Sequence, residues 1–133
     1  MAEITDFTTV ELNEAVEVDW DNSVDAERKF DLDVADEKFL ILIDHGGTDG
    51  AENLVVRAEA GDFIQKGYGD VTSPEIAAGE QYVMVVESGV VKDEDGEVIL
   101  KLEEDDGDDF GTDSSDTLDD IGIAVVQLSY STA

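Results

Sequence analysis

The chain contains no cysteine, only one histidine and one proline, and few basic residues. Without cysteine, neither disulfides nor thiolate metal sites are available. Only 7 Lys and Arg residues oppose 36 Asp and Glu residues, so the cations that bind phosphate backbones or anionic lipid headgroups are scarce. We therefore expect no nucleic acid and no membrane as partner. The longest apolar run, Phe39–Ile43, is far shorter than the roughly 20 residues that a membrane-spanning helix needs.

Recognisable catalytic motifs are also missing. The single histidine, His45, lies beside Asp44 in a glycine-rich segment, and a general base needs a nucleophile and an oxyanion donor that converge on it. The chain has no phosphate-binding loop, zinc-protease motif or nucleophile elbow. Carboxylates are so abundant that no pair is marked out as a glycosidase-type acid and base. The sequence predicts no enzyme activity and no catalytic residue.

Acidic residues dominate what is present. The formal net charge is -29, the sequence pI is near 4.1, and the acids are spread from Glu3 to Asp120. Such a chain repels itself in ordinary buffer, but at about 1 M salt the Debye length falls to ~3 Å and the repulsion nearly vanishes. We interpret the charge as adaptation to a halophilic source. An acidic mesophilic protein, in which charge serves solubility, is the alternative.

The rest of the composition favours one β-rich domain. The 133 residues include 16 valines, which favour strands, and no stretch has helical periodicity over a helix length. Period-2 alternation or short apolar runs predict strands at Phe7–Leu12, Ala15–Trp20, Phe30–Val34, Lys38–Asp44, Asn53–Ala60, Asp70–Thr72, two arms within Gln81–Leu102, and Ile121–Tyr130. The predicted fold is all-β: a single-domain, jelly-roll-like β-sandwich of about eight strands spanning residues 1–133.

Several segments carry more specific predictions. Gln81–Leu102 alternates on both sides of a polar turn that ends in Asp95-Gly96, which is typical of a β-hairpin. Lys38–Asp44 is apolar on both faces, which favours a central strand covered on both sides. Residues 21–29 are polar and turn-like, and Ala78-Gly79 is a predicted turn. We expect residues 1–6 to form an N-terminal arm and residues 103–120 an acidic loop that only Phe110 and Leu118 could hold down.

The acid-rich segments could at most bind Ca²⁺ or Mg²⁺ weakly, because these cations prefer oxygen ligands. Neither Lys92–Glu97 nor Glu103–Asp120 matches the EF-hand ligand pattern. A hydrated acidic surface explains both segments more simply. The sequence therefore predicts no metal ligand and no cofactor.

A family resemblance lies between Phe39 and Leu128. The residues that carry it are FLILID, Ala60-Gly61-Asp62 leading into Gly69-Asp70, Ala78-Gly79, Glu87-Ser88-Gly89, and Gly96 before VILKL. In order, they resemble small β-sandwich proteins of tailed viruses, the capsid decoration or minor capsid proteins. The likeness covers about two-thirds of the chain. The acidic segment Glu103–Asp120 departs from the family pattern, so it leaves open which face would meet the shell.

The resemblance implies a structural virion protein of a virus that infects a halophilic archaeon. It would be made in the host cytoplasm, bind the outer face of the major capsid protein on the capsid surface, and stabilise the shell in high salt as a homotrimer. The expected contacts are the N-terminal arm and the loop Gly61–Pro74, which are poor in charge or rich in glycine. The predicted partner-contact residues in and beside these segments are Ile4, Phe7, Phe63, Ile64 and Tyr68.

Two other functional classes stay open at this stage. A glycan- or receptor-binding head on a virion turret, fibre or cell surface would use an exposed aromatic cluster such as Phe63, Tyr68 and Phe110. An acidic mimic of DNA would need evenly spaced acids along one face, and the β-alternation of this chain interrupts its acids.

The charge interpretation predicts that salt stabilises the fold. We expect the midpoint of thermal unfolding to be clearly higher in 2 M than in 0.1 M salt, because screening removes repulsion within the folded state. Circular dichroism melts at the two salt concentrations measure this. Equal midpoints would contradict adaptation to high salt.

Overall fold

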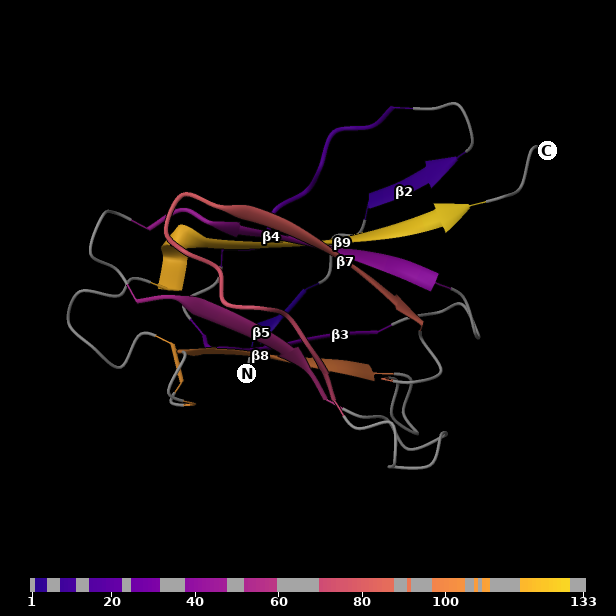
Figure 1. The fold of residues 1–133 in the computed structure, drawn as a ribbon. Helices are drawn as coiled ribbons and strands as arrows, with labels where there is room; N and C mark the ends of the chain where they lie inside the picture. The colour runs from indigo at the N-terminus through magenta and orange to yellow at the C-terminus, as the bar shows by residue number, and fades with distance from the viewer. Residues whose placement is uncertain are drawn as a thin grey trace.

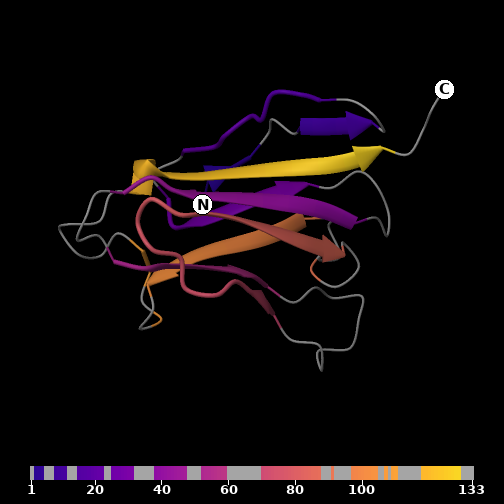
Figure 2. The same ribbon diagram turned by 45° about the horizontal axis from the view of Figure 1, so that its top comes forward.

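A computed structural model describes residues 2–4, 8–11, 15–22, 25–31, 38–47, 52–59, 70–87, 91, 97–104, 107, 109–110 and 118–129. Two β-sheets lie face to face, as Figures 1 and 2 show. Their strands are β1 (Ala2–Glu3), β2 (Thr8–Glu11), β3 (Glu27–Asp31), β4 (Lys38–His45), β5 (Leu54–Ala58), β6 (Val71–Thr72), β7 (Gln81–Glu87), β8 (Glu97–Glu104) and β9 (Ile121–Ser129). A short 3₁₀ helix, η2 (Leu118–Asp120), precedes β9.

The strands divide into a five-stranded sheet A and a four-stranded sheet B. The order in sheet A is β1-β3-β8-β5-β6, and the order in sheet B is β2-β9-β4-β7. Two edge pairs, β1 with β3 and β2 with β9, are parallel, and the other pairs are antiparallel. The predicted all-β single domain is confirmed. Its jelly-roll likeness stays a prediction.

The hydrophobic core lies between the two sheets and follows from the alternation. Along β8 every second side chain is buried, and the same alternation runs through β5. The rings of Phe30 from sheet A and Phe39 from sheet B meet edge to face, with centroids 5.7 Å apart. Burying each large apolar side chain contributes about 1.5–3 kcal/mol. The fully buried members include Ile41, Ile43, Leu54, Val56, Val98, Leu100, Leu102, Ile121 and Ile123.

The predicted hairpin is wrong. Its two arms are strands β7 and β8, but β7 pairs with β4 in sheet B, whereas β8 lies between β3 and β5 in sheet A. Val91, in the connection between the arms, is buried in the core with 2% of its surface exposed. The chain therefore crosses from one sheet to the other between the arms. A polar turn motif indicates where a strand ends, but it does not determine which strand it pairs with.

Two other strand predictions need correction. Residues 15–20 form no strand, and the segment joins sheet B only at the next residue, Asp21, which bridges Ile123. The strand predicted to start at Phe30 begins at Glu27, so the predicted turn-like stretch 21–29 includes the start of β3. Because Glu27 to Lys29 are polar, the start of this strand was not predicted. Its inward side chains are Arg28 and Phe30.

Other predictions agree with the structure. Phe110 is buried and Leu118 packs against the core, as expected for the two residues that hold the acidic segment. The chain turns at Ala78-Gly79, where Gly79 has a φ of 88°, a conformation that favours glycine.

Arg28 is a basic side chain enclosed in the protein interior. None of its surface is exposed, and its guanidinium donates hydrogen bonds to four backbone carbonyls from segments far apart in the sequence. The acceptors are Asp25 at 3.2 Å, Asp21 at 3.0 Å, Ile121 at 3.1 Å and Leu118 at 3.3 Å. Burial lowers the pKa of Arg28, and the nearby carboxylates of Asp21 and Asp25 oppose that shift. Arg28 thus connects sheet A to the start of β9.

We expect Arg28→Met to destabilise the fold by about 3 kcal/mol, because the methionine fills space but leaves buried carbonyls without a donor. Urea unfolding at constant salt measures the loss. The matched control is Lys29→Met, one position along β3, because Lys29 lies on the outer face in an ion pair with Glu97. Equal losses for both variants would contradict a clamping role for Arg28.

Candidate functional site

The two sheets present very different outer faces to solvent. On sheet A most outward side chains are charged, and they form ion pairs between strands. Lys29 contacts Glu97 at 3.0 Å, and Lys101 contacts Glu59 at 3.0 Å. Hydrogen bonds to these glutamates raise the pKa of both lysines. This face is a charged ladder suited to contact with water.

Arg57 is the centre of that ladder. Its guanidinium forms a two-pronged pair with Glu103, with nitrogen–oxygen distances of 3.0 and 3.1 Å, and a further bond of 2.7 Å to Asp70. These hydrogen bonds raise the pKa of Arg57 above its ordinary value. The arginine joins β5, β8 and the residue before β6, which indicates a structural role.

Sheet B has an outer face built from aliphatic side chains. The register places Leu40 of β4 between Val126 and Val85, and Leu42 between Ala124 and Val83. The next row ends the apolar surface, because the Gln81 amide donates to Asp44 at 3.3 Å. We call the set formed by Leu40, Leu42, Val83, Val85, Ala124 and Val126 the apolar face.

Exposure increases across the apolar face from β9 to β7. Ala124 and Val126 on β9 are 0% and 4% exposed, whereas Val83 and Val85 on β7 are 58% and 63% exposed. Leu40 and Leu42, between them, are half-buried. The outer face of sheet B is therefore buried at β9, half-buried at β4 and exposed at β7. Val83 and Val85 are adjacent on the outer side of β7, and they stay exposed to water although the chain has a net charge of -29.

Trp20 lies at one end of the apolar face. A β-carbon on Gly122 would lie 3.0 Å from Cε3 of the Trp20 ring, so the missing side chain of Gly122 is what lets the indole rest on β9. The backbone of Asp21 bonds to Ile123 in both directions, at 2.8 and 3.0 Å, and fixes this position. Trp20 is 41% exposed.

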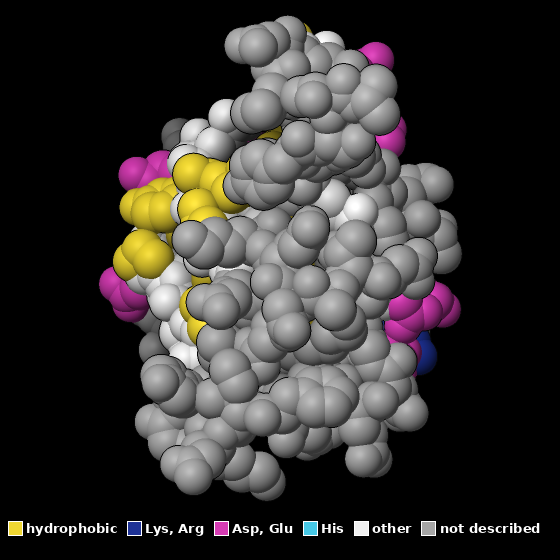
Figure 3. All heavy atoms as spheres, turned by 90° about the vertical axis from the view of Figure 1, so that its right-hand side faces the viewer, with side chains coloured by type: hydrophobic (Ala, Val, Ile, Leu, Met, Phe, Trp, Pro, Cys, Tyr) yellow, Lys and Arg dark blue, Asp and Glu magenta, His cyan; other side chains and the backbone are white. Residues whose placement is uncertain are grey.

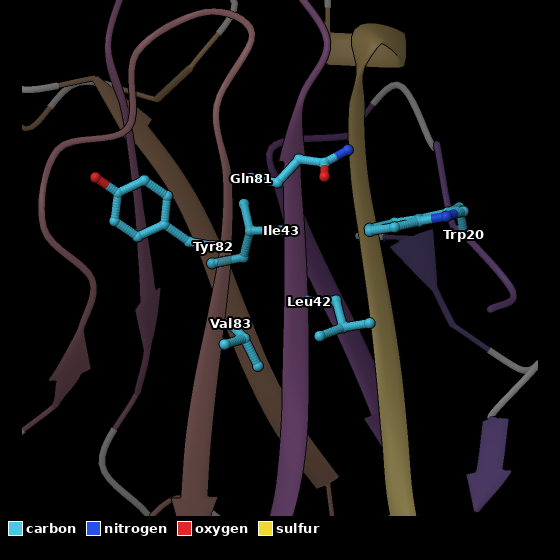
Figure 4. Close-up of a pocket in the computed structure, with 6 residues that line it drawn as sticks. All are labelled: Trp20, Leu42, Ile43, Gln81, Tyr82 and Val83. Carbon is cyan, nitrogen blue, oxygen red and sulfur yellow. The ribbon is translucent and has the colours of Figure 1, made fainter. Parts of the chain in front are cut away.

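An open pocket lies between Trp20 and β7. Its volume is about 270 Å³, and Figure 4 shows the six residues that line it, Trp20, Leu42, Ile43, Gln81, Tyr82 and Val83. In Figure 3 hydrophobic side chains gather on one flank of the molecule, with acidic side chains at their margin. The apolar face and this pocket together are the candidate site, and they are suited to binding rather than to chemistry.

Ile4 is the only predicted contact residue among the described residues, and its burial contradicts the prediction. Its side chain is 3% exposed and belongs to the core, and its backbone N–H donates to Lys29 at 2.8 Å. Residues 2–3 form strand β1, so this part of the predicted arm belongs to sheet A because it completes the ladder beside β3. The other four predicted contacts, Phe7, Phe63, Ile64 and Tyr68, lie outside the described residues.

His45 and Phe110 lie together in the interior. His45 has no exposed surface, although its glycine-rich surroundings predicted an open loop. Its Nδ1 accepts from the Gly47 N–H at 3.2 Å, so Nε2 carries the hydrogen and donates to the Glu52 carbonyl at 2.8 Å. The rings of His45 and Phe110 meet edge to face at 5.5 Å. Phe110 is therefore not part of an exposed aromatic cluster.

Within the described residues, no group of three or more His, Cys, Asp and Glu side chains could hold a metal ion. Much of the two acid-rich segments considered for weak Ca²⁺ or Mg²⁺ binding lies outside the described residues. In the part of the chain that is described, no helix has the length and apolar character needed to cross a bilayer.

The sequence held a signal for the apolar face. Lys38–Asp44 is apolar on both faces, and the middle outward positions of β7 and those of β9 are apolar as well. Three adjacent strands with apolar outward positions produce an apolar sheet surface. Their adjacency could not be read from the alternation alone, because β7 was expected to pair with β8.

Comparisons with known proteins give no match: no family model, no curated protein and no solved structure is similar to this chain.

We expect Gly122→Ala to displace Trp20, because the added methyl group would enter the van der Waals contact of the ring. Trp20 is the only tryptophan, so its emission should shift to longer wavelength and acrylamide should quench it more strongly. Gly79→Ala is the control, since Gly79 has strained φ but no neighbour within 4 Å. It should lower stability and leave the emission unchanged. The same emission for Gly122→Ala as for the wild type would contradict the contact.

Proposed function

We propose that this protein is a structural binding protein, which attaches through the apolar face to the major capsid protein of a virus of a halophilic archaeon. It decorates the outer surface of the shell and stabilises it in high salt. This proposal keeps the partner implied by the family resemblance. It moves the main contact from the N-terminal arm to sheet B.

The exposure of Val83 and Val85 is the observation that carries the proposal. Large apolar surface that stays in water on an otherwise charged protein marks an interaction site. The fold already covers part of each valine, so a partner that covers the rest contributes roughly 1–2 kcal/mol per valine. Apolar contact is also not weakened by salt, since salts that are excluded from the surface strengthen burial.

The charge distribution supports the same face. A shell from the same brine is expected to be acidic, so a contact made through carboxylates would be repulsive at close range. The apolar face offers a contact without that cost, and the charged ladder on sheet A is left toward solvent. The order of sequence features between Phe39 and Leu128 adds the capsid as the specific partner.

The test is the location and copy number of the chain in purified particles. We expect a fixed ratio to the major capsid protein, with labelling over the whole shell. The double variant Val83→Ser/Val85→Ser should lower binding to undecorated shells at least tenfold, because two buried valines are lost from the contact.

Val55→Ser is the matched control, since Val55 is a half-buried outward valine on sheet A. It should leave shell binding unchanged. Absence of the chain from particles would contradict the proposed function. Full shell binding by the double variant would contradict the proposed face.

A glycan- or receptor-binding head is the second candidate, and the pocket beside Trp20 favours it. An exposed indole next to the Gln81 amide combines an apolar platform with polar groups, as small-molecule sites often do. Binding of the isolated protein on a glycan array, lost in Trp20→Ala, would favour this candidate. Labelling of the whole shell would favour decoration.

A further inference from the structure

Strand β7 is the free edge of sheet B. It pairs with β4 on one side and has no strand on its other side in the described sheet. Figure 2 shows it as the outermost strand of its layer. Proteins usually protect such an edge with lysine, proline, a bulge or a very short strand. β7 is seven residues long, with the sequence QYVMVVE, and contains neither lysine nor proline.

The direction of the backbone groups on β7 follows from the β4–β7 ladder. The N–H of His45 donates to the carbonyl of Glu80 at 3.0 Å, and in an antiparallel pair the bonded positions recur at every second residue. With the observed register, Tyr82, Met84 and Val86 bond to β4. The alternate residues therefore direct their N–H and C=O groups to the free edge: Gln81, Val83, Val85 and Glu87.

These outward groups have no partner among the described residues. The structure contains no hydrogen bond from the backbone of Val83 or Val85 other than those of strand pairing, and β7 has no pairing on that side. The same two valines expose most of their side chains on the apolar face. The free edge can therefore pair with another extended strand, and the exposed valine side chains favour apolar neighbours.

The distribution of charge along β7 indicates which kind of strand can pair with its free edge. Between Gln81 and Val86 the strand has no charged residue, in a chain of net charge -29. When β7 is laid antiparallel beside a second β7 with Met84 at the centre, Val83 lies opposite Val85 of the second copy. Gln81 then lies opposite Glu87 of the second copy, so no two acids of the strand face each other. The edge is complementary to itself.

We propose that two copies of this chain associate through β7, antiparallel and centred on Met84, to form one continuous eight-stranded sheet. All four outward residues of each β7 then make backbone hydrogen bonds, because residues of the same parity are opposite each other. The contact is isologous, as in most homodimers, and this dimer replaces the homotrimer that the family resemblance implied. The apolar faces of both copies lie on the same side of the joined sheet, where they form one larger surface.

The first test removes a single outward N–H. Val85→Pro deletes a donor of the dimer and none of the β4 ladder, since proline is tolerated where the N–H faces away from the sheet. Two hydrogen bonds are lost per dimer, one from each copy, so we expect the dimer dissociation constant to rise roughly thirtyfold. Val85→Ala keeps the N–H and should change it much less. Sedimentation of the isolated protein at fixed salt measures both.

The second test reads the register and does not depend on how proline is tolerated. In Val83→Lys/Val85→Glu, each lysine lies opposite a glutamate of the second copy, so dimers should persist. In Val83→Lys/Val85→Lys, lysines face lysines, and dimers should be lost at moderate ionic strength. Circular dichroism checks that both variants keep the fold.

A wild-type protein that stays monomeric at all concentrations would overturn the proposal, as would an unchanged dimer in Val85→Pro. Equal behaviour of the two double variants would overturn the register centred on Met84. The readout uses no capsid, so its failure is separate from failure of the proposed function.

Discussion

A two-layer β-sandwich can bury only one face of each sheet against the other, and this constraint governs the molecule. The inner faces meet through Phe30, Phe39 and the isoleucines of β4 and β9, and the outer faces must be satisfied in another way. Sheet A solves this with charge, through pairs such as Lys29 with Glu97. Sheet B does not, because the middle outward positions of its three long strands, β9, β4 and β7, are aliphatic. The protein therefore has more apolar sheet surface than its own fold covers.

Placement of the cations fits the same division. Lys29, Arg57 and Lys101 lie on the outer face of sheet A in ion pairs, and exposed pairs of this kind contribute little to stability in strong salt. Arg28 differs because it is enclosed, and its hydrogen bonds to backbone carbonyls are not screened. Among the described cationic side chains, one fixes the interior and the other three relieve repulsion among carboxylates on the outer face of sheet A.

Much of the fold could be predicted from alternation, and its pairing could not. Lys38–Asp44 and the strand after Asp120 were recognised as short apolar runs bounded by polar segments, a pattern typical of strands in a sandwich core. Backbone hydrogen bonds are nearly independent of side-chain identity, so the sequence did not state that β7 joins β4. Arg28 was missed for a related reason: a cation in a polar stretch gives no sign that backbone carbonyls of Asp21, Asp25, Leu118 and Ile121 will surround it.

The candidate site was less predictable than the fold. Partner contacts were sought where charge is low along the chain, and that rule selected Ile4, whose apolar side chain the core uses. The apolar face exists only in three dimensions, since Leu40, Val83 and Ala124 come from three distant segments. A surface formed by neighbouring strands can be predicted only when the order of the strands in the sheet is known.

The position of β9 has a consequence for how the chain reaches this structure. β9 is a central strand of sheet B, paired with β4 and with β2, yet it is formed by residues 121–129. Its partner Leu40 is separated from Val126 by most of the chain, and closing such long loops is slow. During synthesis one side of β4 therefore stays unoccupied until residues 121–129 have left the ribosome. Until then the nascent chain carries an aliphatic strand that is open to wrong pairing.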